Sequence, residues 1–283
     1  MKQNFATLFF SVLCLLFATT SLRAGDGLLP GATDKDPLTI EANRLDMKDA
    51  QKLLVYTGEV LVTNGPSTLK SANLTIFLDN AAEGAAGGST MDRVNRVDAA
   101  GPVVINTQKE TYSGNQLNYE RAQNKIYMTG NVTIQQGDGL TKADNLEFDK
   151  ATSSALLTGN VIYQKGASVV KGEKLIYDQV KDKVFLTGNV IYVSGETTVT
   201  GTKMDFDKKA NTALFTGNVV YAKKDTVVKG DAMEYNLTTN QGVVRTGAPT
   251  TGATVGPLGD DVAPLTPRPR VKAIFTPGQG KGM

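Results

Sequence analysis

The 283-residue sequence has no histidine and no tryptophan, and Cys14 is its single cysteine. Without histidine the chain lacks the commonest general base and the commonest metal-binding side chain. It also cannot form a Ser-His or Cys-His nucleophilic pair. Chemistry would be left mainly to carboxylates, lysine and tyrosine. We predict, for reasons given below, that the protein is not an enzyme and uses no cofactor and no metal ion.

The first 24 residues have the pattern of a secretory signal peptide. Lys2 precedes an apolar run over residues 5–17, and the segment ends in Ala24. This run is too short to span a bilayer, and no later segment is long and apolar enough to do so. Cleavage after Ala24 would also remove Cys14, so the mature chain could form no disulfide. We expect the mature chain to be soluble and to lie outside the cytoplasm.

The mature chain also lacks an excess of either charge. Loss of the signal peptide removes Lys2 and Arg23, which changes the count from 30 basic against 28 acidic residues to 28 against 28. A formally neutral chain does not have the basic surface that nucleic-acid binding requires. We therefore expect no nucleic-acid partner.

The dominant signal is an internal repeat. A glycine, mostly preceded by threonine, marks each copy, and from Gly101 to Gly217 successive marks are 29 residues apart. A second column of small residues lies between them, and seven copies cover about residues 38–247. One copy has 13 extra residues in an Ala/Gly-rich stretch near 80–92, which predicts an inserted loop. The two columns are Gly58, Gly101, Gly130, Gly159, Gly188, Gly217 and Gly247, and Ala42, Ala72, Gly114, Ala143, Gly172, Gly201 and Gly230.

Each copy predicts two β-strands. Around Gly188 the apolar residues lie at −4, −2, +2 and +4. This alternation predicts a strand of about nine residues, roughly 30 Å long, with one apolar face. The glycine lies on that face, where it would allow a strand or ligand to approach closely, or the strand to bend. Around the second column the apolar residues lie at −2, +3 and +5, so the buried face changes side. Such a change predicts a bulge or corner, as in barrels and jelly rolls.

Seven copies of two strands predict about 14 antiparallel strands in sequence, a stack on the order of 65 Å long at ~4.8 Å per strand. Each copy would be supported by its neighbours, and the two ends would be exposed. Asp149, Asp178 and Asp207 recur where strands end. Catalytic acids or calcium ligands are conceivable there, but the period favours turn residues.

The chain divides into four parts: the signal peptide 1–24, an N-terminal linker 25–36, a repeat domain 37–248 and a tail 249–283. Six of the ten prolines lie in the tail, whereas residues 103–248 contain none. We expect the tail to be a disordered linker; the alternatives are an extra edge strand or contact with lipid phosphates. The tail carries a basic and apolar patch, Arg268, Arg270, Val271, Lys272, Ile274 and Phe275.

The signal peptide, the opening TIEANRLDM (residues 39–47), the inserted loop and the recurring TGNV together resemble the organic-solvent-tolerance A-like family of periplasmic lipopolysaccharide transport proteins. The resemblance implies an all-β, elongated, slightly twisted antiparallel jelly roll that is open along one side. It implies a periplasmic location and an apolar interior that carries the acyl chains of lipid A. It also implies head-to-tail self-association and pairing with similar jelly-roll domains at the inner and outer membranes.

On this interpretation the inward apolar residues form the lipid-binding groove. For any single position, filling of a closed core is the simpler assignment, and the resemblance favours a groove for the set. Tyr163, Tyr192 and Tyr221 are ambiguous, because a tyrosine hydroxyl at a rim suits both a headgroup and water. The expected groove residues are Ile126, Met128, Val132, Ile134, Leu157, Val161, Tyr163, Leu175, Tyr177, Leu186, Val190, Tyr192, Met204, Phe206, Phe215, Val219 and Tyr221.

Two other classes of protein compete with this interpretation. A polysaccharide-active β-helix enzyme would need paired carboxylates, and no acidic cluster interrupts the repeat. A structural β-repeat scaffold, filament former or adhesin needs no continuous apolar lining. The interior of the folded protein therefore discriminates between the scaffold and the carrier.

Overall fold

The computed structural model describes residues 27–33, 35–79, 93–236, 238–239, 241–247 and 271–275. The signal peptide, the inserted loop 80–92 and the tail residues Arg268 and Arg270 lie outside this described part. The strands are β1 (Leu38–Glu41), β2 (Arg44–Lys48), β3 (Leu53–Asn64), β4 (Ser67–Leu78), β5 (Val94–Asn106), β6 (Glu110–Glu120), β7 (Lys125–Gln136), β8 (Gly139–Asp149), β9 (Ser154–Lys165), β10 (Ser168–Asp178), β11 (Lys183–Ser194), β12 (Thr197–Asp207), β13 (Thr212–Lys223), β14 (Thr226–Asn236), β15 (Gln241–Arg245) and β16 (Lys272–Phe275).

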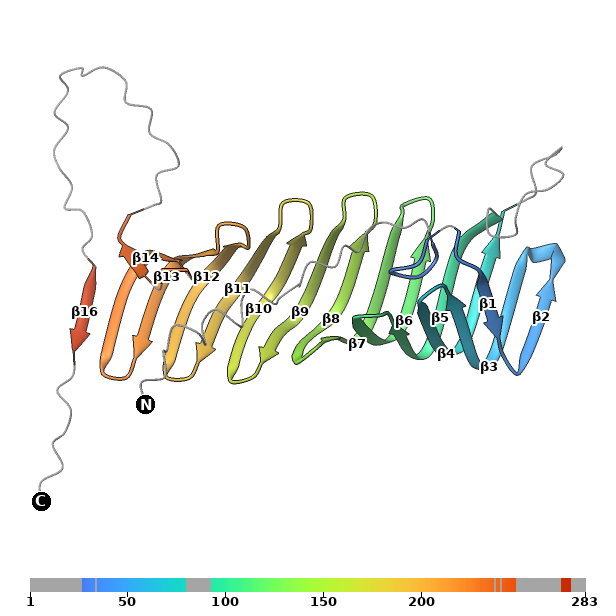
Figure 1. The fold of residues 1–283 in the computed structure, drawn as a ribbon, viewed down its shortest axis with the longest axis horizontal. Helices are drawn as coiled ribbons and strands as arrows, with labels where there is room; N and C mark the ends of the chain where they lie inside the picture. Colours follow the sequence, from blue (N-terminus) through green and yellow to red (C-terminus); the bar gives the residue numbers. More distant parts are fainter. Residues whose placement is uncertain are drawn as a thin grey trace, which may run out of the picture.

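All of these strands belong to one antiparallel sheet, in which neighbours in space follow chain order from β1 to β15 (Figure 1). The path contains fourteen strands, and β2 and β16 lie beside it on β3 and β14. No ladder among the described residues joins the first strands to the last, so the sheet is not closed. The expected all-β architecture and the succession of fourteen strands are confirmed.

The long strands, β3 to β14, bend near their middle, at the positions of the repeat columns. Gly188 and Asn189 both have left-handed backbone angles, with φ of 83° and 46°. The pairing of β10 with β11 shifts register between Lys171 and Lys174, where the small column lies. The second-column bulge is therefore confirmed. For the glycine of the TGNV segment, the sequence left two alternatives, close approach of a strand or ligand and a bend of the strand. The structure shows a bend. Because the bend consists of two successive left-handed residues, the alternation of inward and outward side chains is the same on both sides of it.

The bends fold the sheet into two walls that face each other. Side chains from both halves of the strands meet in one apolar core that runs through the repeats. One layer of this core alternates large and small residues along the stack. Phe206 pairs with Val184 on β11 and with Ala213 on β13, and Tyr177 lies between Ala155 and Val184 in the same way. Such alternation lets neighbouring side chains interdigitate at interior density.

The recurrent aspartates are turn residues, as the period predicts. Asp149 accepts a hydrogen bond from the backbone N–H of Thr152 at 3.0 Å, and Asp178 accepts one from Lys181 at 2.9 Å. Asp207 makes the same contact with Ala210 at 2.9 Å. These backbone N–H groups are the main reason that the pKa of each carboxyl lies below its ordinary value of 3.8.

These turn contacts predict that the free energy of unfolding decreases at acidic pH. Because the folded-state pKa values are lowered, the turns contribute stability above the ordinary pKa of 3.8, and this contribution is lost as the pH falls through the lower folded values. A triple variant D149N, D178N, D207N keeps the acceptor oxygens but cannot titrate. We expect urea unfolding at about pH 6 and about pH 3 to show a smaller acid-induced loss for this variant than for the unmodified chain. An unchanged loss would contradict the assignment.

Part of the tail is ordered against the sheet. β16 pairs with the first half of β14, from Thr226↔Phe275 to Lys229↔Lys272, while β15 pairs with the second half. The alternative of an extra edge strand therefore describes residues 272–275, and the expectation of disorder does not hold for them. Backbone groups at an edge gain hydrogen bonds by such pairing, and this gain offsets part of the ordering cost. Thus β15 and β16 together occupy the fourteenth strand position, just as β1 and β2 share the first.

Candidate functional site

The interior of the folded sheet lies between two rows of hairpin loops. Rim A is the row that includes residues 121–124, 150–153, 179–182 and 208–211. Rim B is the opposite row, and it consists of residues 65–66, 107–109, 137–138, 166–167, 195–196 and 224–225. Between the rims, the two walls enclose what we call the trough.

The structure places every expected groove residue on the inner surface of these walls. All of them are buried except Tyr221, which is half-buried and packs against the same core. The half of each strand next to rim A provides Ile126, Met128, Leu157, Leu175, Tyr177, Leu186, Met204, Phe206 and Phe215. The half next to rim B provides Val132, Ile134, Val161, Tyr163, Val190, Tyr192, Val219 and Tyr221. Their role as lipid contacts stays a prediction.

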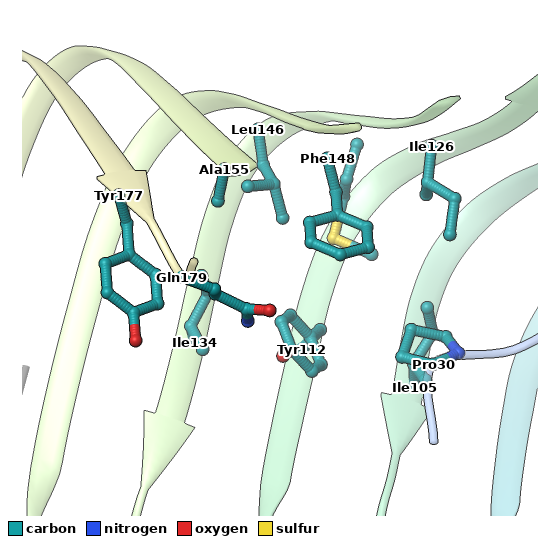
Figure 2. A pocket seen from close by; sticks show the side chains of 11 residues that line it. Pro30, Ile105, Tyr112, Ile126, Ile134, Leu146, Phe148, Ala155, Tyr177 and Gln179 are labelled. Carbon is teal, nitrogen blue, oxygen red and sulfur yellow. The ribbon is translucent and has the colours of Figure 1, made fainter. Parts of the chain in front are cut away.

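The protein's own side chains fill most of the trough. Along β10 to β13 the inward residues are almost completely buried; Leu186, Met204 and Phe206 are each no more than 1% exposed. The best-formed cavity lies nearer the middle of the stack, between Met128, Phe148, Tyr112 and Pro30 (Figure 2). Its volume is about 40 Å³, which is far below the several hundred Å³ of a typical small-molecule site. An acyl chain could therefore enter the trough only if the side chains that fill it moved.

The trough is open at its N-terminal end. Leu45 and Met47 of β2 pair with Tyr56 and Leu54 of β3, which pack against the core, so all four side chains belong to the inner face. Leu45 is 45% exposed and Met47 is 70% exposed, because no further strand of the described part covers them. The apolar lining therefore continues to the end of the stack.

Part of the expected N-terminal linker, residues 27–32, lies inside the trough. Leu28 and Leu29 are buried in the same core as the strands, and Ala32 is buried as well. The two leucines line a space with residues of β3 to β7. No periodicity marks this segment, so the repeat analysis gave no reason to include it among the interior residues.

Cationic side chains fold inward at rim A. The Nζ atom of Lys150 lies 5.4 Å from the centroid of the Tyr119 ring, and that of Lys208 lies 5.2 Å from Tyr177. Lys208 also forms an ion pair of 3.0 Å with Asp182. Both lysines occupy the same position of their repeats. Rim A therefore combines an aromatic layer with positive charge, an arrangement suited to cation–π contact.

Tyrosine hydroxyls and one carboxyl introduce polarity on the other side. Burial raises the pKa of Tyr163 strongly, and among the described residues its hydroxyl has no hydrogen-bond partner. Burial also raises the pKa of Tyr192 to about 12, against the hydroxyls of Ser194 and Ser168, which lower it. Burial likewise raises the pKa of Glu110, which accepts a hydrogen bond from Tyr112. Two of the three ambiguous tyrosines are therefore enclosed rather than exposed at a rim.

Several aromatic residues of the inner surface were missed from the expected set, among them Tyr112 at the cavity. Tyr119, Phe148 and Tyr235 occupy the same repeat position as Tyr177 and Phe206 and belong to, or pack against, the same core. The 29-residue period was the signal that could have found them. Within the described ranges, no group of three or more His, Cys, Asp or Glu side chains is arranged to hold a metal ion. Among the described residues, no helix is long and apolar enough to cross a membrane.

The fold and the trough define a class of repeat-built, open β-sheet proteins with an apolar interior along their length. The chain belongs to the family described as LptA/(LptD N-terminal domain) LPS transport protein, whose model matches residues 39–183 and 140–241. The two matched spans overlap, as expected when a long repeat is matched in two registers.

Two individual proteins are also similar. An uncharacterized protein of Rhizobium meliloti (strain 1021) is 27% identical over 85 residues, which cover 29% of this chain and 43% of that protein. The match therefore spans less than half of the relative's length. The crystal structure of LptH, the LptA homologous periplasmic component of the lipopolysaccharide transport device from Pseudomonas aeruginosa, matches with a TM-score of 0.34 and 18% identity. That match covers 46% of this chain and 82% of LptH. Family membership rests on the family model.

Proposed function

We propose that the protein carries lipopolysaccharide through the periplasm, with the acyl chains of lipid A held in the trough and the polar headgroup outside it. The observation that carries this proposal is the continuous apolar interior, which reaches the end of the stack at Leu45 and Met47. A scaffold or filament protein needs no continuous apolar lining between its walls. Membership of a lipopolysaccharide transport family supports the same conclusion.

The physical need for such a carrier follows from the cost of exposing lipid to water. Each buried CH₂ group is worth ~0.8 kcal/mol, so a single twelve-carbon chain would cost on the order of 10 kcal/mol if exposed. A lipid with several chains therefore requires cover along its whole route. The trough would supply that cover, and energy for directed movement would come from other proteins of the pathway.

Photo-crosslinking tests the trough with a matched pair of aromatic positions. Phe148 of β8 points into the cavity, whereas Tyr127 of the neighbouring β7 lies on the outer face and is half-exposed. We expect p-benzoylphenylalanine to form an adduct with lipopolysaccharide in cells at position 148 but not at position 127. Both changes replace an aromatic residue by a larger one, so the two positions differ mainly in the face of the sheet on which they lie. Equal yields at the two positions would argue against a lipid-bearing interior.

We further propose that protomers associate end to end and pair with similar domains at the two membranes, which would make the trough continuous. The exposed edge of β2 at one end and that of β15 and β16 at the other can each accept a further strand. Such pairing would bury Leu45 and Met47. It would also satisfy backbone groups that only water can reach in the free protomer.

Charge at the N-terminal edge should weaken this association. In the variant L45E, M47E two carboxylates would have to be buried on pairing, and we expect the dissociation constant to rise at least about tenfold. Sedimentation velocity over a concentration series measures the effect. The control is V180E, because Val180 is 71% exposed but lies in a rim A loop in mid-stack. If both variants self-associate like the unmodified chain, end-to-end pairing at β2 is wrong.

A further inference from the structure

Residues Gly27–Ala32, which we call the strap, cross the trough from one rim to the other. At rim A, the Nζ atom of Lys150 donates a hydrogen bond of 3.0 Å to the carbonyl oxygen of Gly27. At rim B, the side chain of Ser67 donates one of 2.6 Å to the carbonyl oxygen of Pro30. In Figure 1 the blue N-terminal segment accordingly lies across the strands rather than along them, and in Figure 2 Pro30 lies beside Ile105 at the cavity.

The strap fills apolar volume between the walls. Leu28 and Leu29 share their surroundings with Val62, Leu69 and Leu117. Pro30 forms part of the wall of the neighbouring cavity, which Met128 of the predicted groove and Phe148 also line. An acyl chain placed in this part of the trough would have to occupy the same volume. The strap and such a chain therefore exclude each other.

Asn64 at the end of β3 holds the strap in place. Its Oδ1 atom accepts hydrogen bonds from the backbone N–H of Leu28 at 3.1 Å and of Leu29 at 3.4 Å. Its Nδ2 atom donates to the carbonyl oxygens of Asp36 at 3.3 Å and Pro37 at 3.4 Å. The side chain is 2% exposed. Both polar atoms of this buried amide therefore form hydrogen bonds to the backbone of residues 28–37, the segment that contains the strap and leads out of the trough.

The strap is attached in a way that permits release. Within the described residues its backbone joins no ladder of the sheet; it bonds to the side chains of Asn64, Ser67 and Lys150 and makes one internal turn, from the N–H of Ala32 to the carbonyl of Leu29. Cleavage after Ala24 would leave only two residues before Gly27. A short free chain end can leave the trough without breaking any strand pairing.

We propose that the strap is an internal competitor for the acyl chain of lipopolysaccharide, and that the N-terminal half of the trough, from β3 to β9, is the subsite it closes. The strap occupies this subsite in the lipid-free protein and leaves it when an acyl chain enters. Its Gly27 carbonyl marks the place at Lys150 where the polar end of the chain is bound. The inference rests on the proposed function and adds the position of the subsite and the device that closes it.

Release of the strap should tighten lipid binding. If the closed form accounts for about nine-tenths of the molecules, freeing the subsite lowers the apparent dissociation constant about tenfold. We expect this change for N64A and for a chain lacking residues 25–33, measured by fluorescence polarisation with dye-labelled lipopolysaccharide. The matched control is N73A, which removes an exposed asparagine from the neighbouring strand β4. It should bind like the unmodified chain.

Fixing the strap should have the opposite effect. A Cβ atom added at Gly31 would lie 3.3 Å from Oγ of Ser67, a distance compatible with a disulfide between cysteines at these positions. The mature chain has no other cysteine. In the variant G31C, S67C we expect oxidation to weaken binding at least about tenfold relative to the reduced form of the same variant, and reduction to reverse this loss.

The outcomes separate the strap from the proposed function. If the released and oxidised variants bind lipopolysaccharide with the affinity of the unmodified chain, or if release weakens binding, the strap is no competitor, although the lipid-carrying function stands. If neither the unmodified chain nor the released variants bind lipopolysaccharide, the proposed function itself fails. Should the deletion not fold, as judged by circular dichroism, N64A and the cysteine pair decide the question.

Discussion

Replacing Phe206 with alanine should lower the free energy of unfolding by about 3–5 kcal/mol, the usual cost of removing a fully buried phenylalanine. Phe206 is 1% exposed and lies across the trough layer between Val184 and Ala213, neither of which can extend into the space that its ring leaves. The lost contacts and the remaining cavity therefore add to each other. Urea unfolding followed by circular dichroism measures the effect.

Phe185 provides the matched control for this prediction. It is the same residue type on the adjacent strand β11, but it points outward and is only half-buried. Its replacement by alanine removes contacts without opening an internal cavity, so we expect a loss of about 1 kcal/mol. Equal losses at the two positions would mean that the interior tolerates empty volume. Repeat proteins unfold locally, so the effect should be strongest in probes placed near β11 to β13.

The second large effect is expected at the bend of the TGNV motif. In the variant G188V a β-branched residue must adopt φ near 83°, which costs roughly 1–2 kcal/mol for a residue with a Cβ. The new Cβ atom would also lie 2.5 Å from Cβ of Glu173 on β10, so the backbone must shift. Overpacking of this kind costs about 1–3 kcal/mol. We expect a total loss of about 2–5 kcal/mol in the free energy of unfolding.

The turn glycine Gly195 separates the two contributions. It has φ of 55°, and an added Cβ atom would meet nothing within 4 Å. The variant G195V should therefore lose only the roughly 1–2 kcal/mol of backbone strain. If G188V is no more destabilised than G195V, close approach of the neighbouring strand does not explain the glycine of the motif.

The repeat made most of the fold predictable. A period of 29 residues with two alternating segments can satisfy its apolar faces only by stacking copies, so the strand order follows from the chain order. The change of parity around Gly172 predicted the bulge, and the position of Asp178 predicted its turn contact. The bend at Gly188 was left undecided, because two successive left-handed residues restore the alternation that a single extra residue would break.

The sequence by itself determined which side chains face inward, since in a strand the direction of a side chain depends only on local periodicity. Only the tertiary structure decided how those side chains share the interior: how little empty volume remains beside Met128, and that Leu28 and Leu29 occupy part of it. It also decided that residues 272–275 add a strand to β14. The strap and β16 have no periodic pattern, because each occurs only once along the chain. The strap occupies interior volume, and β16 pairs with backbone groups at a sheet edge. Both the volume and the edge exist only after the repeats have folded.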